Sequence, residues 1–141
     1  MKEVFVTNSP EETLKIGKIL GEKAREGDLI AIYGDLGTGK TTLSKGIALG
    51  LGISEDITSP TFSLMEIYKG QKTFYHFDLY RIESENELNN LFFEEYWEKD
   101  GVSVIEWPER ASSRLPKNRI EVFIEYINDF QRRITIEYPY N

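Results

Sequence analysis

Residues 34–41 read Gly34-Asp35-Leu36-Gly37-Thr38-Gly39-Lys40-Thr41 and fit the phosphate-binding loop pattern G-x-x-x-x-G-K-[ST] at every fixed position. Glycines let the backbone take positive φ and come close enough for consecutive N–H groups to surround a phosphate. In this pattern Lys40 supplies a positive charge to the β- and γ-phosphates, and the Thr41 hydroxyl is a ligand of Mg²⁺. The stretch therefore predicts a site for nucleotide phosphates with Mg²⁺.

The residues on either side of this loop suit a strand and a helix. Asp28 to Tyr33 is a short apolar run typical of a buried strand, and Thr42 to Leu51 places Leu43, Ile47 and Leu51 on one helical face. The positive end of that helix then faces the anion. We expect the nucleotide to be held by eight consecutive residues: Asp35, Leu36, Gly37, Thr38, Gly39, Lys40, Thr41 and Thr42.

Composition limits the class of protein. The 141 residues are 40% hydrophobic and 13% aromatic, which predicts one domain over residues 1–141 with a substantial core. The chain has no cysteine and one histidine, which excludes thiolate chemistry and multi-histidine metal centres. We expect a cytoplasmic protein with no membrane association, because there is no apolar run of about 18 residues and no signal-peptide core. A net charge of −7 argues against direct binding of nucleic acid, so any contact with RNA runs through a partner.

Seven runs of β-forming residues predict the sheet: Lys2 to Thr7, Asp28 to Tyr33, Phe62 to Lys69, Thr73 to Leu79, Val102 to Pro108, Arg119 to Ile127 and Arg132 to Tyr138. Gly70-Gln71 and Asn128-Asp129 indicate two antiparallel hairpins, of which the C-terminal one is expected to cover one edge of the core. The predicted fold is α/β, of the P-loop NTPase type, with a mixed, mainly parallel sheet flanked by helices.

Two capping boxes predict two further helices. Ser9-Pro10-Glu11-Glu12 begins a helix that runs to about Arg25, and Ser84-Glu85-Asn86-Glu87 begins one that runs to about Lys99. The glutamates of the second helix are typical of a solvated face, with an acidic docking surface as the alternative.

Two predicted strands end in an acid, Asp78 and Glu106. An acid at the end of an apolar strand suits a carboxylate that holds Mg²⁺ through water. We therefore take Lys40, Asp78 and Glu106 as the candidate catalytic residues, and Thr41, Asp78 and Glu106 as the candidate metal ligands. The sequence leaves the division of roles between the two acids open.

Other residues near these motifs have both a structural and a functional interpretation. The Thr58-Ser59-Pro60-Thr61-Phe62 segment is a tight turn or a switch that senses the γ-phosphate. His76 is a core histidine more often than a catalyst. Trp107 packs in the core or belongs to a lid or a partner contact. Arg81 and Arg110 either neutralise phosphate charge or pair with neighbouring carboxylates. Thr7, Asn8 and Ser9 either cap a helix or touch the adenine.

Taken in order, these motifs resemble the TsaE (YjeE) family of small bacterial P-loop ATPases. The resemblance covers nearly the whole chain. It is carried by the loop followed by S-P-T-F at 59–62, His76-Phe77-Asp78-Leu79-Tyr80-Arg81, and Glu106-Trp107-Pro108-Glu109-Arg110. The loop alone is common to many proteins, but this succession is highly specific.

The resemblance implies a role beyond the spacing of the motifs. Members of this family bind ATP and Mg²⁺, hydrolyse ATP slowly alone, and associate with the TsaB and TsaD proteins that make threonylcarbamoyladenosine in tRNA. By motif position, Lys40 and Thr41 hold phosphate and metal, while Asp78 and Glu106 serve Mg²⁺ and its waters. Thr61 and Trp107 belong to segments that respond to nucleotide state.

Two functions from other classes remain as alternatives. A nucleotide-gated binding module uses ATP to shape an interaction surface without productive turnover. A small-molecule kinase uses the same loop but also needs an acceptor pocket and an arginine-bearing lid, for which the chain is short. A GTPase is disfavoured because the sequence contains no N-K-x-D motif.

Overall fold

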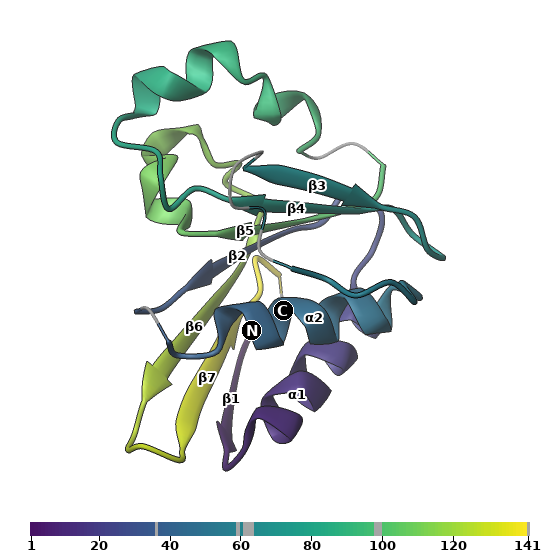
Figure 1. Ribbon diagram of the computed structural model, residues 1–141, viewed down its shortest axis with the longest axis vertical. Helices are drawn as coiled ribbons and strands as arrows, with labels where there is room; N and C mark the ends of the chain where they lie inside the picture. Colours follow the sequence, from purple (N-terminus) through teal and green to yellow (C-terminus); the bar gives the residue numbers. More distant parts are fainter. Residues whose placement is uncertain (36, 59, 61–63, 98–99, 141) are drawn as a thin grey trace.

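The centre of the protein is a seven-stranded sheet in the order β1-β7-β6-β2-β5-β4-β3 (Figure 1). The computed structural model describes residues 1–35, 37–58, 60, 64–97 and 100–140. The strands are β1 (Lys2–Thr7), β2 (Leu29–Tyr33), β3 (Met65–Tyr68), β4 (Phe74–Asp78), β5 (Val102–Glu106), β6 (Ile120–Tyr126) and β7 (Arg132–Glu137). The helices are α1 (Pro10–Lys23) and α2 (Lys40–Gly50), with short 3₁₀ helices η1 (Glu85–Asn90), η2 (Phe93–Glu95), η3 (Pro108–Arg110) and η4 (Ser112–Arg114).

The sheet is mixed and mainly parallel, as predicted. Strands β6, β2, β5 and β4 are parallel neighbours, while β3 and β7 pair antiparallel with β4 and β6. The expectation that the C-terminal hairpin covers an edge is wrong, because β6 pairs in parallel with the central strand β2 and β1 forms the edge beyond β7. The reason is burial: Val122 and Ile124 of β6 are fully enclosed beneath the helices, a position that an edge strand does not offer.

Helices α1 and α2 lie together on one face of the sheet (Figure 1). The predicted capping box opens α1, since the Ser9 hydroxyl accepts the Glu12 N–H at 3.2 Å and the Glu12 carboxylate accepts the Asn8 N–H at 2.7 Å. The predicted helix end near Arg25 comes slightly earlier, at Lys23. Beneath the two helices lies an apolar core that includes Leu20, Ile47 and residues of β2, β5 and β6.

Four glycines, Gly17, Gly21, Gly46 and Gly50, allow the two helix backbones to touch. A Cβ added at Gly46 would lie 2.2 Å from the Leu14 carbonyl oxygen, and one at Gly21 would lie 2.2 Å from the Ile47 carbonyl oxygen. Helix α2 begins at the loop, so this contact fixes the loop helix against α1 and against the turn that precedes α1.

We expect Gly46→Ala to destabilise the protein by about 3 kcal/mol, because the added methyl group overlaps backbone that cannot move alone. The measurement is the midpoint of urea unfolding. Lys45→Ala at the adjacent exposed position of the same helix is the control and should leave the midpoint nearly unchanged. Equal midpoints for the two variants would contradict the close packing of α1 on α2.

The other face of the sheet is covered by the chain before β5, which holds η1 and η2, and by the chain after β5, which holds η3 and η4. The Phe77 ring lies 5.1 Å from the Phe93 ring and 6.1 Å from the Trp97 ring, centroid to centroid. The predicted helix from Ser84 to about Lys99 is wrong: the chain forms two short 3₁₀ helices, interrupted at Phe92, whose φ is 58°. This turn separates η1 from η2 and allows Phe93 and Trp97 to pack on the sheet. Residues 98 and 99 lie outside the described ranges.

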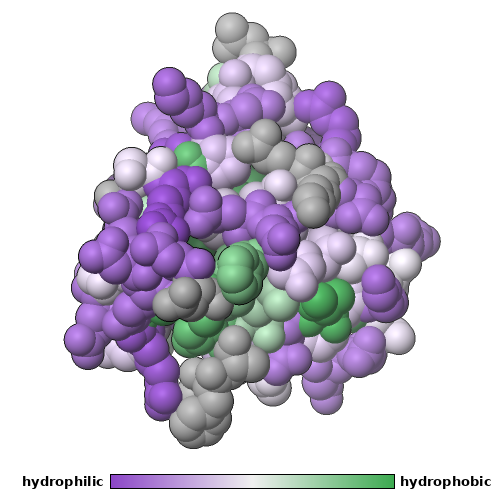
Figure 2. All heavy atoms as spheres, turned by 90° about the horizontal axis from the view of Figure 1, so that it is seen from above, coloured by the Kyte–Doolittle hydropathy of each residue, from purple (hydrophilic) through white to green (hydrophobic). Residues whose placement is uncertain are grey.

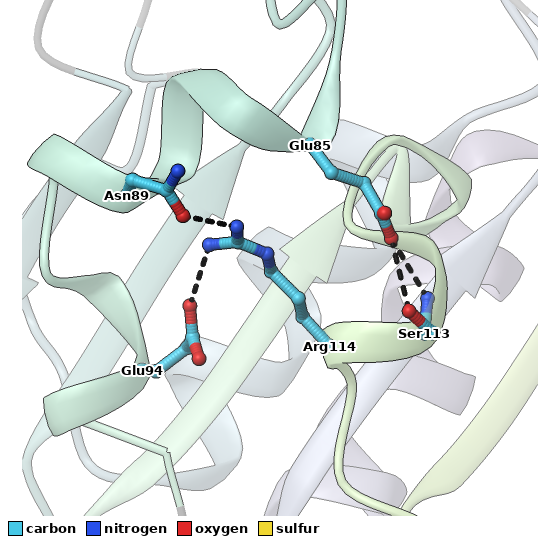
Figure 3. A network of polar contacts seen from close by, with 5 residues as sticks. All are labelled: Glu85, Asn89, Glu94, Ser113 and Arg114. Carbon is cyan, nitrogen blue, oxygen red and sulfur yellow. Dashed lines mark hydrogen bonds and ion pairs between the residues drawn. The ribbon is translucent and has the colours of Figure 1, made fainter.

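Acidic side chains of η1 and η2 are paired with residues of η4 (Figure 3). The Arg114 guanidinium donates to the Glu94 carboxylate at 3.1 Å and to the Asn89 side-chain oxygen. The Glu85 carboxylate accepts the Ser113 N–H at 3.0 Å. These contacts tie η1 and η2 to η4, so these two glutamates are not simply a solvated face.

The surface on the side of these short helices is mostly hydrophilic, with a small group of apolar side chains near the middle of the view (Figure 2). At the chain ends, the Met1 amino group donates to the Tyr140 carbonyl at 2.9 Å, which holds the N- and C-termini side by side (Figure 1). No helix in the described ranges is both long and apolar enough to span a membrane.

Candidate functional site

The loop joins β2 to α2 and bends through two glycines with positive φ. Gly37 has a φ of 80° and Gly39, the N-cap of α2, a φ of 111°, values that L side chains rarely adopt. The Asp35 carbonyl accepts the Thr38 hydroxyl at 2.8 Å and the Thr38 N–H at 3.3 Å, which closes the turn. The predicted glycine positions thus have a conformational reason. Leu36 lies outside the described residues.

Lys40 lies at the first position of α2 and is only 6% exposed. Its Nζ donates to the Gly34 carbonyl at 2.6 Å and lies 3.4 Å from the centre of the Trp107 ring. Burial lowers the pKa of the ammonium group, and the neighbouring acids, Glu106 first, oppose that shift. The structure therefore keeps a costly buried charge beside the loop, next to two carboxylates.

The two predicted acids lie side by side. Asp78 ends β4 and Glu106 ends β5, and they are direct partners in the parallel register of these strands. Glu106 is 2% exposed, whereas Asp78 is half-buried. Burial raises the pKa of the Asp78 carboxyl and Glu106 raises it further, while the Tyr80 N–H, His76 and Lys40 lower it. The two strands thus supply one acidic site and do not compete for it.

Two polar side chains that the sequence did not identify as partners reach Glu106. The Ser44 hydroxyl of α2 donates to Glu106 Oε2 at 3.1 Å, and His76 Nε2 of β4 lies 2.6 Å from the same oxygen. We call Ser44, His76 and Glu106 the Glu106 network. His76 and Asp78 are two residues apart in β4, so they lie on the same face of the sheet, and this spacing was the available indication that His76 lies near the site. The indication for Ser44 was weaker, because it is only a polar residue on the buried side of the loop helix.

Among the cavities beside the loop, two share Gly37, Gly39 and Thr42. The first, of about 310 Å³, we call the acidic cavity; its other lining residues are Lys40, Thr41, Asp78, Tyr80, Glu106 and Trp107. The second, of about 300 Å³, we call the hairpin cavity; its other lining residues are Asn8, Ser9, Pro10, Thr13, Thr38, Asp129, Phe130 and Arg132. Asp35 lines neither of them.

The hairpin cavity combines the turn before α1 with the tip of the β6–β7 hairpin. Arg132 Nε donates to the Thr38 carbonyl at 3.1 Å, and its guanidinium lies 4.3 Å from the centre of the Tyr126 ring. The hairpin is therefore fastened to the loop. Ser9 both caps α1 and lines this cavity, so the two interpretations of the turn are compatible.

An aromatic pair borders the acidic cavity. The Trp107 backbone is left-handed, with φ 59° and ψ 49°, and its ring centre is 5.0 Å from that of Tyr80. Arg110 donates from Nη1 to the Ile82 carbonyl at 3.1 Å and lies near both rings, which engages it in the segment that follows β4. Strain at a non-glycine residue beside a cavity is typical of a functional site.

Part of the predicted site falls outside the described residues. Ser59, Thr61 and Phe62 of the proposed switch are among these, while Thr58 and Pro60 are described. Arg81 is exposed. In the described ranges, no cluster of three or more His, Asp or Glu side chains is arranged to hold a metal ion. The oxygen donors present, one hydroxyl and two carboxylates, suit Mg²⁺, which keeps several waters and takes other ligands from phosphates.

We expect Asp78→Asn to raise the Tm of the metal-free protein at pH 7 by about 2–4 °C, or about 1 kcal/mol in a chain of this size. The raised pKa means that the ionised carboxylate opposes folding, and asparagine removes that charge while keeping an acceptor for the Tyr80 N–H. The gain should shrink as the pH falls below the raised pKa of the native carboxyl, and it should disappear below the ordinary value of 3.8, where Asp78 is neutral in both the folded and the unfolded chain.

Thermal melts in a metal chelator measure this effect. Asp56→Asn, at an exposed position, is the matched control and should leave the Tm unchanged. A lower Tm for Asp78→Asn at pH 7 would show that the carboxylate stabilises the fold, against this prediction.

A glycine-bent loop between a parallel strand and a helix, with a buried lysine and two strand-end acids in one cavity, defines a protein of the P-loop class. The family profile described as "Threonylcarbamoyl adenosine biosynthesis protein TsaE" matches residues 7–134. The chain belongs to the TsaE family, which confirms the resemblance carried by its motifs.

Individual relatives agree with this assignment. The chain is 40% identical over 131 residues to the tRNA threonylcarbamoyladenosine biosynthesis protein TsaE of Treponema pallidum, covering 93% of this chain and 97% of the relative. It is 42% identical over 130 residues to the TsaE protein of Bacillus subtilis, covering 92% and 81%. The crystal structure of Bacillus subtilis YdiB superposes with a TM-score of 0.87 at 34% identity, covering all of this chain and 88% of that one.

Proposed function

We propose that this protein binds ATP with Mg²⁺, hydrolyses it, and thereby acts on a TsaB–TsaD complex that threonylcarbamoylates adenosine in tRNA. The observation that carries the proposal is the acidic cavity, in which Lys40, Asp78 and Glu106 meet beside the loop. Membership of the TsaE family supports the role in tRNA modification. With a net charge of −7, the protein meets tRNA through its partners. The location that we propose with this role is the cytoplasm.

The residues have separate tasks in this proposal. The loop amides and Lys40 bind the β- and γ-phosphates and stabilise the charge that develops on the transferred group. Thr41, Asp78 and Glu106 hold Mg²⁺ and its waters, and the ion, when bound, neutralises phosphate charge. The carboxylates also orient the water that attacks the γ-phosphorus in line with the leaving oxygen.

The hairpin cavity is the proposed place for the nucleoside. It adjoins the acidic cavity through Gly37, Gly39 and Thr42, so one ligand can extend from one cavity into the other. Asn8 and Ser9 supply polar groups and Phe130 an aromatic ring, the combination that a purine base requires.

One observation favours the gated binding module as a second candidate. Lys40 is engaged by the Gly34 carbonyl and the Trp107 ring, so it must change partners before it can stabilise a γ-phosphate. These contacts of Lys40 suit a protein that binds ATP readily but hydrolyses it slowly. In the favoured account, the partner complex completes the site.

The test is ATP binding and phosphate release by the purified protein, with and without Mg²⁺. We expect slow, Mg²⁺-dependent release of phosphate and no transfer of labelled phosphate to nucleosides or small alcohols, a transfer that would identify a kinase. Binding of ATP with no release under any condition would favour the gated module.

A further inference from the structure

The Glu106 carboxylate lies in an environment that must provide hydrogen-bond donors. At 2% exposure it has almost no access to water, and a buried carboxylate without donors is very costly. The donors within the Glu106 network are the Ser44 hydroxyl and His76 Nε2, and both reach the same oxygen, Oε2. Neither of these bonds uses Oε1.

His76 itself is firmly held. It is fully buried in β4, and its ring stacks on that of Phe74 with centroids 5.4 Å apart and planes inclined by 17°. Its Nδ1 is buried and has no hydrogen-bond partner among the described residues. A carboxylate only accepts hydrogen bonds, so the network assigns a proton to Nε2. The ring therefore has one polar task, which is to donate to Glu106.

The neighbouring acid is held differently. Asp78 is half-buried and accepts the Tyr80 N–H at 3.0 Å, a bond to the chain only two residues further on. Glu106 is instead fixed from a second strand and from the loop helix. This contrast separates the two acids: Glu106 is oriented in advance by the core, whereas Asp78 borders the cavity from a more accessible position.

We propose that His76, together with Ser44, is a positioning residue that holds Oε2 of Glu106 and so presents Oε1 to Mg²⁺ and its waters. This inference rests on the proposed function. A purely stabilising role explains the arrangement less well, because a buried histidine–carboxylate pair adds little stability compared with apolar residues of similar size. Partners of metal-binding carboxylates typically matter through orientation.

The experiment compares ADP affinity with and without Mg²⁺ by calorimetry, so it does not depend on turnover. The variants are His76→Leu, which removes the donor, and His76→Gln, whose amide nitrogen can occupy nearly the position of Nε2. Val102→Ala is the control for loss of core packing. Val102 is fully buried and lies on the same face of β5 as Glu106, but it is not part of the Glu106 network. Thermal melts accompany each titration.

Wild type and Val102→Ala should bind ADP more tightly with Mg²⁺, even though Val102→Ala lowers the Tm. His76→Leu should lose about 10–100-fold of that gain while its metal-free ADP affinity stays close to wild type, and His76→Gln should recover most of the loss. If His76→Leu gains as much as wild type, or if His76→Gln behaves like His76→Leu, the positioning role is overturned and the proposed function stands. If wild type gains nothing from Mg²⁺, the proposed function itself fails, and this inference fails with it.

Discussion

Lys40→Ala is expected to weaken ATP binding and to abolish measurable turnover, with a loss of about 10²–10³-fold or more in the rate of phosphate release. The Lys40 ammonium is the positive charge that the structure places between the loop and the two carboxylates, at 6% exposure. In such surroundings, removal of the charge leaves Asp78 and Glu106 without the group that balances them. The phosphates would then face two acids with only the loop amides to hold them.

The measurement is ATP affinity by calorimetry, together with phosphate release under saturating ATP. Lys45→Ala is the matched control: it removes the same charge from an exposed position of the same helix and should change both quantities by no more than about twofold. The Tm of both variants confirms folding. An ATP affinity and a turnover rate for Lys40→Ala equal to those of Lys45→Ala would refute the assignment of the loop.

Glu106→Gln is expected to separate binding from turnover. The glutamine side chain has the same shape and keeps an oxygen that can accept from Ser44 and His76, so the buried network survives. It lacks the negative charge that, in the proposed function, holds Mg²⁺ and orients water, so phosphate release should fall by about 10²–10³-fold. ATP affinity in the absence of metal should remain or improve, because one negative charge near the phosphates is gone.

Glu109→Gln provides the control for this change. Glu109 is exposed, lies three residues from Glu106 and contributes to the electrostatic environment of Lys40, so the same charge is removed nearby. It should lower phosphate release by about twofold at most. Equal losses in the two variants would mean that overall negative charge, and not the position of Glu106, supports turnover.

The sequence predicted the features that depend on local pattern. The loop, the strand before it and the helix after it are consecutive, so their chemistry could be inferred without knowledge of the fold. Asp78 and Glu106 were each recognised as strand-end acids. Their common site depends on the pairing of β4 with β5, which joins residues 28 positions apart and leaves no local signal.

The errors share the same physical origin. The segment from Ser84 to Lys99 has helical spacing and a capping box, yet packing of Phe93 and Trp97 on the sheet and the left-handed turn at Phe92 produce two short 3₁₀ helices. The C-terminal hairpin was expected at an edge, but the buried positions of β6 are satisfied only beside β2. Tertiary contacts decided both outcomes.

The contacts of His76 and Glu106 illustrate the same limit at the site. A single histidine in an apolar strand is usually a core residue, and by burial His76 is one. Its Nε2 lies 2.6 Å from Oε2 of Glu106, a residue 30 positions away in the chain, and this contact changes the interpretation of the histidine. Only the structure shows that the two residues meet.

The measurement that tests the central claim most directly is ATP hydrolysis by this protein alone and with purified TsaB and TsaD, with Lys40→Ala as the blank. We expect turnover that rises when the pair is added and disappears in the variant, as a partner-completed Mg²⁺-dependent ATPase requires. Turnover that stays flat while the pair still binds in an ATP-dependent way would contradict this account and identify a nucleotide-gated binding module.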